Sequence, residues 1–157
     1  MTIIKQEDLI QSIADALQFI SYYHPVDFIR SLAAAYEREQ SPAARDAIAQ
    51  LLINSRMCAE GHRPICQDTG IVSVFLKVGR EVHFEGELPL EEMINEGVRR
   101  AYLLPENKLR ASILTDPAGA RKNTKDNTPA VLNVQIVEGN KLDVTVAAKG
   151  EIGRAHV

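Results

Sequence analysis

The spacing of apolar residues changes once along this chain, and Gly70 marks the change. Before Gly70, apolar side chains recur at steps of three and four residues, which is the pattern of amphipathic helices. After it, the stretch Ile71–Val78 is short, rich in β-branched residues and bounded by glycine, as strands commonly are. Helices followed by strands predict an α+β arrangement rather than a regular alternation of the two.

The helical spacing predicts about three helices within the first part of the chain. Pro25 and Pro42 stand where the second and third helices could begin, because the missing N–H of proline costs nothing in a first turn. Ser41 is the expected N-cap of the third helix. We interpret the apolar stripes of these helices as core. On the first helix the stripe consists of Leu9, Ile10, Ile13, Leu17 and Ile20.

The second part of the chain combines strand patterns with one more helix. Residues 88–103 return to helical spacing, while Ala130–Val137 and Lys141–Lys149 alternate between apolar and polar positions. The sequence EGN between these two strands is typical of a hairpin turn. We therefore expect an α+β fold, with the N-terminal helices followed by a small mixed or antiparallel sheet and a further helix.

Composition limits the classes of partner. Hydrophobic residues make up 45% of the 157 residues, which is enough for a core, and the formal net charge is −3. That charge gives no electrostatic reason to expect a nucleic acid or a membrane surface as partner. No apolar run approaches the length of a membrane span, and the start of the chain lacks the features of a secretory signal. We expect a cytoplasmic protein.

The stretch HRPICQDTG concentrates reactive and polar groups in a loop before the first expected strand. Cys66 is open to two interpretations, a buried structural thiol or a soft-metal ligand. Pairing with His62 as a nucleophile is disfavoured, because an extended segment would hold the two side chains apart. Gln67 and Asp68 suit an oxygen-rich substrate, although Asp68 could equally form a turn with the backbone near Gly70. The other cysteine, Cys58, lies too far from Cys66 for a CxxC metal motif.

A second polar loop, residues 114–130, precedes the next strand. Its donors, among them Arg121, Lys122 and Asn127, form either a solvated turn or a rim around an anionic substrate. Arg110 precedes a strand-like apolar pair, which predicts that it points inward. A guanidinium matches two carboxylate oxygens, but a surface cation is the alternative.

Five stretches in order carry a resemblance to a known family: RPICQDTG, NEGVRRAY, NKLRASIL, NTKDNTPA and VTVAAKG. Residues 1–150 closely resemble the N-terminal domain of class I fumarate hydratase, the iron–sulfur-dependent enzyme. The alpha subunit of L-tartrate dehydratase is a close relative. The most specific signatures are CQDTG and, about sixty residues later, NT-x-DNTPA.

The resemblance implies a [4Fe–4S] cluster held by three cysteines, with one iron open to the substrate. Cys66 matches the first cluster ligand. Gln67, Asp68 and Arg110 match substrate-binding positions, and the Asp68 carboxylate is implied as the catalytic group in proton transfer. Gly150 also matches a substrate-binding position. Cys58 matches no ligand and is expected to be a small buried residue near the end of the third helix.

The activity implied by the resemblance is the reversible hydration of fumarate to L-malate, a hydro-lyase reaction of the tricarboxylic acid cycle. The implied partners are a small dicarboxylate substrate and a second copy of the chain, in a homodimer. Dehydration of L-tartrate is the alternative activity. For this chain alone, a non-catalytic folding or dimerisation domain is a further alternative.

The end of the sequence departs from the family pattern. After AAKG the family continues with a glycine-rich GGSENK-like stretch, whereas this chain has EIGRAHV. We expect residues 1–150 to be a truncated domain and residues 151–157 to be a non-native tail. The other two cluster cysteines would then lie outside the chain. The isolated chain is accordingly expected to hold no stable cluster and to be inactive.

Overall fold

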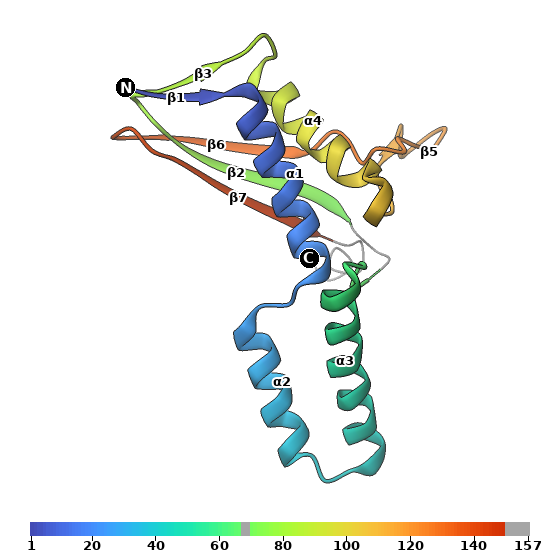
Figure 1. Ribbon diagram of the computed structural model, residues 1–157. Coiled ribbons are helices and arrows are strands. Elements are labelled where there is room, and N and C mark those ends of the chain that lie inside the picture. The colour runs from blue at the N-terminus through green and yellow to red at the C-terminus, as the bar shows by residue number, and fades with distance from the viewer. Residues whose placement is uncertain (67–69, 150–157) are drawn as a thin grey trace. The chain divides into compact units, whose positions relative to one another are not determined.

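The computed structural model describes residues 1–66 and 70–149, which divide into two compact units. The smaller one, here the hairpin unit, spans Phe19–Cys66. The larger one, here the sheet unit, combines residues 1–18 with the chain from residue 67 onward. The chain thus leaves the sheet unit in its first helix and returns to it just before the first long strand (Figure 1).

The predicted helices are confirmed, with boundaries close to those expected. Proline sets two of the N-termini, since Pro25 precedes the second helix and Pro42 opens the third. Ser41 occupies the N-cap position, but its side chain makes no capping hydrogen bond. A short 3-10 turn, Pro105–Asn107, follows the last helix. The helices are α1 (Gln6–Tyr22), α2 (Val26–Arg38), α3 (Pro42–Gly61) and α4 (Leu90–Leu103).

The strands of the described residues form three small sheets. The strands are β1 (Thr2–Lys5), β2 (Ile71–Gly79), β3 (Val82–Glu85), β4 (Leu114–Thr115), β5 (Lys122–Asn123), β6 (Val131–Val137) and β7 (Leu142–Lys149). The main sheet has the order β6-β2-β7, with β2 parallel to β6 and antiparallel to β7. Strands β1 and β3 pair in parallel, and β4 and β5 pair antiparallel. The α+β class and the mixed sheet are therefore as predicted.

The predicted hairpin between the last two strands is wrong, because β2 lies between β6 and β7. The connection between them crosses the end of β2, where the Gly79 N–H donates to Lys141 O and the Glu81 N–H donates to Gly139 O. A Cβ atom on Gly79 would lie only 2.4 Å from Gly139 O. Alternation identified both strands, but it carries no information on which strand pairs with which.

The core of the sheet unit lies where α1 and α4 cover one face of the main sheet (Figure 1). Alternate residues of β2 point into it, and Val72, Val74 and Leu76 are each at most 1% exposed. The predicted stripe of α1 is buried from Leu9 to Leu17, but Ile20 is 38% exposed. Ile20 already belongs to the hairpin unit, whereas the core that buries the rest of the stripe belongs to the sheet unit.

Helices α1 and α4 approach closely at Gly97, which is buried on α4. A Cβ atom there would lie 2.7 Å from the Cβ of Ile13 and 2.8 Å from the backbone oxygen of Ile10.

We predict that Gly97→Ala lowers the free energy of unfolding by about 1–3 kcal/mol through overpacking, although alanine favours helix. Chemical denaturation measures the change. Gly61→Ala on α3 is the control, because a Cβ there meets only Arg63 Cγ at 3.4 Å. Equal changes in the free energy of unfolding for the two variants would contradict the close approach of α1 and α4 at Gly97.

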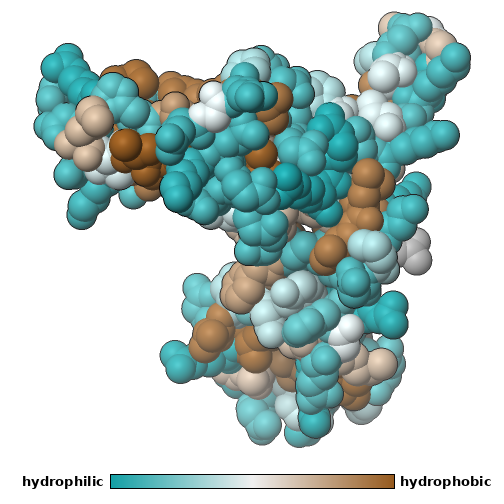
Figure 2. All heavy atoms as spheres, turned by 45° about the horizontal axis from the view of Figure 1, so that its top comes forward, coloured by the Kyte–Doolittle hydropathy of each residue, from teal (hydrophilic) through white to brown (hydrophobic). Residues whose placement is uncertain are grey.

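The hairpin unit consists of the end of α1 together with α2 and α3. In α3 only Ser55 and Cys58 are buried, and in α2 no residue is. The Tyr22 and His62 rings stack at 4.7 Å between centroids, and His24 Nδ1 lies 3.0 Å from Ser55 Oγ. Hydrophobic atoms therefore reach the surface of this unit, as Figure 2 shows.

Among all the residues that the structure describes, no helix has the length and apolar character that a membrane span needs.

Candidate functional site

Cys66 lies at the end of the hairpin unit and is exposed. Just before it, the Ile65 N–H donates to Ser21 O at 2.8 Å, which ties this segment to the end of α1. The interpretation of Cys66 as a buried structural thiol is therefore wrong. An exposed thiol that forms no disulfide is chemically available as a metal ligand.

Cys58 has the opposite environment. It is buried in the last turns of α3, and its sulfur lies 3.7 Å from both Asn54 Oδ1 and Pro64 O. The expectation of a small buried residue is confirmed. The two cysteines of the chain thus differ in accessibility. Only Cys66 can be reached by a ligand from solvent.

Three of the predicted substrate-binding residues fall outside the described part of the chain. They are Gln67, Asp68 and Gly150. Their predicted roles stay predictions. The first described residue after the loop, Gly70, is buried and has a φ of 64° at the start of β2. This left-handed conformation favours glycine, so it accounts for the last residue of CQDTG.

Arg110 is exposed, between the buried Leu109 and the half-buried Ala111. The prediction that it points inward is wrong. An exposed guanidinium still suits the binding of a carboxylate, because its N–H fork can reach a ligand from solvent. Arg110 lies in the sheet unit, shortly before β4.

Asn127 is the residue of the second polar loop whose role sequence reasoning missed. Its side chain is fully buried, with an exposed fraction of 0%. Its Oδ1 atom accepts hydrogen bonds from the N–H groups of Ser112 (2.6 Å) and Ile113 (3.2 Å), and its Nδ2 atom donates to Gly70 O (2.9 Å). We call these four residues the Asn127 anchor. The dipeptide Asp-Asn was the available signal, since asparagine tolerates the left-handed φ of 62° found here.

Residues on either side of Asn127 are bonded to α4. Asp126 accepts hydrogen bonds from the Thr128 N–H and hydroxyl and from Arg99 Nε, the last at 3.2 Å. Burial of the Asp126 carboxyl raises its pKa, but these hydrogen bonds outweigh burial and hold the pKa below its ordinary value. On the other side, the Ala130 N–H donates to Asn95 Oδ1 at 3.0 Å. Residues 126–130 are therefore held in place by hydrogen bonds, whereas residues 115–123 of the same loop are exposed to solvent.

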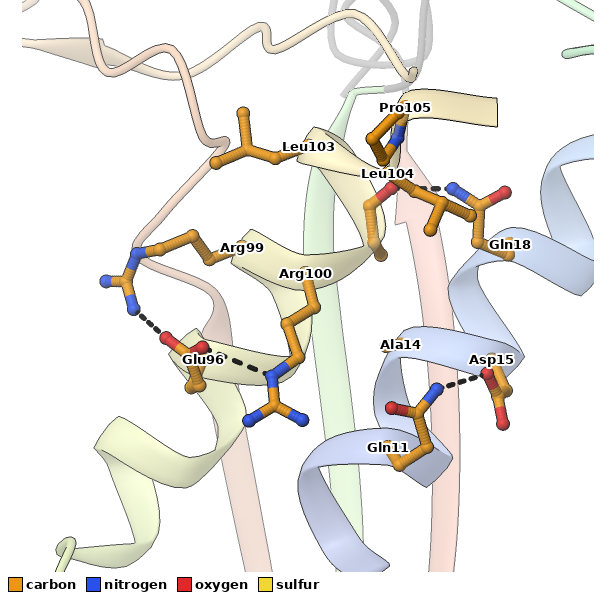
Figure 3. A pocket seen from close by; sticks show the side chains of 11 residues that line it. Gln11, Ala14, Asp15, Gln18, Glu96, Arg99, Arg100, Leu103, Leu104 and Pro105 are labelled. Carbon is orange, nitrogen blue, oxygen red and sulfur yellow. Dashed lines mark hydrogen bonds and ion pairs between the residues drawn. The ribbon is translucent and has the colours of Figure 1, made fainter. Parts of the chain in front are cut away.

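Arg99 and Arg100, the other arginine candidates for a substrate carboxylate, are already paired with acidic side chains. Both extend toward Glu96 in Figure 3. Arg99 also pairs with Asp126, and Arg100 pairs with Glu7. Hydrogen bonds to these carboxylates raise the pKa of each guanidinium. The pocket between α1 and α4 that they line contains none of the predicted site residues. Arg110 stays the arginine that the sequence signatures single out for an anionic ligand, because it lies in NKLRASIL.

Across the ranges 1–66 and 70–149, no three histidine, cysteine, aspartate or glutamate side chains come together as a metal site. The whole sequence holds two cysteines, and only one of them is exposed. Within its described part, the chain presents single groups suited to an iron–sulfur site or an anion rather than a complete ligand set.

Comparisons with known proteins find one matching family and several relatives. Residues 10–154 match the family described as fumarate hydratase (Fumerase). A protein of Methanocaldococcus jannaschii with the provisional name L(+)-tartrate dehydratase subunit alpha is 29% identical over 129 residues, which are 80% of this chain and 44% of that protein. The L(+)-tartrate dehydratase subunit alpha of Escherichia coli O157:H7 is 25% identical over 142 residues, or 90% of this chain and 46% of that protein.

A further relative has the name of a fumarate hydratase. The protein named fumarate hydratase class I, anaerobic, of Escherichia coli strain K12 is 32% identical over 119 residues, which are 75% of this chain and 21% of that protein. The chain spans less than half the length of these three relatives.

Proposed function

Because the chain belongs to the fumarate hydratase (Fumerase) family, we propose that it contributes part of the active site of a hydro-lyase acting on a four-carbon dicarboxylate. The observation that carries the proposal is the exposed Cys66 thiol at the head of the CQDTG signature. It is supported by Arg110, an exposed guanidinium that is chemically suited to a carboxylate.

The favoured reaction is the reversible hydration of fumarate to L-malate. Dehydration of L-tartrate is the second candidate, and it is favoured by the relatives that match the larger shares of this chain, 80% and 90%. Both reactions make or break a C–O bond next to a carboxylate, so the same groups serve either substrate. Arg110 would bind a carboxylate, Gln67 would donate a hydrogen bond and Asp68 would move a proton.

The [4Fe–4S] cluster of class I fumarate hydratases would supply a Lewis acid to this chemistry. The residues of this chain do not make a complete site for it. Three thiolates are needed, whereas the sequence holds two cysteines and Cys58 is buried in α3. Cys66 fits as one thiolate ligand, and we propose that the others come from outside this chain.

The choice between substrates is tested by initial rates. The full-length protein, purified without oxygen, is assayed with fumarate and with L-tartrate at matched concentrations. We expect the larger kcat/KM with fumarate. A larger value with tartrate would assign the second reaction, and activity with neither would overturn the proposed function.

The role of Arg110 gives a prediction of its own. Arg110→Lys in the full-length enzyme keeps the charge but loses the two-pronged contact with a carboxylate. We expect kcat/KM to fall about ten- to a hundredfold, since a charged hydrogen bond contributes roughly 1.5–3 kcal/mol. Arg56→Lys is the matched control, because Arg56 is an exposed arginine paired with Glu60 on α3. Wild-type kinetics in Arg110→Lys would make Arg110 a surface cation.

A further inference from the structure

Asn127 connects two segments that are remote in sequence and that each adjoin a candidate functional group. Gly70, which accepts from its Nδ2 atom, is the last residue of CQDTG and lies 57 residues away. Ser112 and Ile113, which donate to its Oδ1 atom, follow Arg110 by two and three residues. One buried carboxamide thus sets the spacing between the start of β2 and the segment that carries Arg110.

The carboxamide is matched to this task by its chemistry. Its oxygen accepts two hydrogen bonds and its nitrogen donates one, so it satisfies three backbone groups at a site where Asn127 itself is 0% exposed. A carboxylate could keep both acceptor contacts, but it would lose the donor and place a negative charge beside the Gly70 carbonyl. Leaving a buried polar group without a partner costs free energy. Loss of the carboxamide would take a partner from three backbone groups at once.

Asn127 is buried, but it is not the only attachment of its loop to the sheet unit. Its neighbours along the chain keep their own bonds to α4, through Asp126 with Arg99 and through Ala130 with Asn95. Changing the Asn127 side chain should therefore alter the spacing of the two segments while leaving the loop attached to α4.

From this geometry we propose that Asn127 is a positioning residue of the hydro-lyase site, acting through Arg110, whose segment it holds against Gly70. The inference rests on the proposed function. A misplacement on the order of 1 Å in a substrate-binding group costs about a hundredfold in rate. The effect of Asn127 on catalysis should therefore depend on Arg110, whereas a residue that only stabilises the fold would act independently of it.

The first test is a double-mutant cycle in the full-length enzyme. Asn127→Asp should lower kcat/KM at least about tenfold. Combined with Arg110→Lys, it should give an enzyme within about threefold of Arg110→Lys alone, because the arginine contact is already lost. Asn107→Asp is the matched control, since Asn107 is also buried in the sheet unit and its Nδ2 atom donates to Gln18 Oε1 at 2.7 Å. If the fold-loss in kcat/KM of the double variant equals the product of the losses in Asn127→Asp and Arg110→Lys, the proposal is overturned.

The second test needs no activity, so it separates this inference from the proposed function. Amide hydrogen exchange is measured on the full-length wild type and on Asn127→Asp. Peptides around residues 70–74 and 111–114 should lose protection together, while those from α4 keep it. If neither or only one of the two regions changes, the anchor does not couple them and the proposal fails. If the coupling holds but the wild type hydrates or dehydrates neither substrate, the proposed function fails and the positioning of Arg110 for it fails with it.

Discussion

Cys66→Ser is expected to remove both the iron–sulfur absorbance and the hydro-lyase activity of the full-length protein. The sulfur of Cys66 is exposed and forms no disulfide, so iron can reach it from solvent. A serine hydroxyl is a hard ligand and stays protonated near neutral pH, which makes it a poor replacement for a thiolate on an iron–sulfur cluster. The loss should therefore be complete rather than partial. Visible absorbance, iron content and initial rates on anaerobically prepared protein measure it.

Cys58→Ser is the matched control for this experiment. Cys58 is buried, and a hydroxyl in its place would still lie near Asn54 Oδ1 and Pro64 O. We expect the variant to keep both the cluster and the activity, at a cost of about 1 kcal/mol in the free energy of unfolding. If Cys58→Ser lost the cluster and Cys66→Ser retained it, the assignment of the ligand would be reversed.

Ile13→Ala is expected to cause the largest loss of stability, about 2–5 kcal/mol. Ile13 is 0% exposed and contacts α4 at Gly97, so its removal leaves a cavity between two helices that cannot move apart freely. The loss exceeds the transfer term alone because a close-packed core collapses only partly around a cavity. Chemical denaturation followed by circular dichroism measures the difference in the free energy of unfolding.

Ile20→Ala on the same helix provides the comparison. Ile20 has the same side chain and lies three residues beyond Leu17, where the buried stripe ends, but it is 38% exposed. We expect its replacement to cost less than about 1 kcal/mol, since little apolar surface is returned to water. Equal losses in the two variants would mean that α1 buries a different face from the one described.

The sequence already contained what local chemistry controls. The positions of α1 to α4 follow from spacing and proline, because both act within one or two turns of helix. The α+β class follows from the change of spacing at Gly70, and the family membership follows from signatures that are read directly along the chain. The candidate roles of Cys66 and Arg110 came from those signatures and stay predictions.

Only the tertiary structure decided which segments meet. The alternation of β6 and β7 could not show that β2 lies between them, because strand pairing depends on contacts between residues far apart in the chain. Composition suggested a solvated turn or an anion rim around Asn127, whereas the fold buries its side chain against Gly70 and Ser112. The exposure of Cys66 and the burial of Cys58 were likewise not set by their identical chemistry. Each depends on which distant atoms surround the sulfur, and a sequence specifies those atoms only through the completed fold.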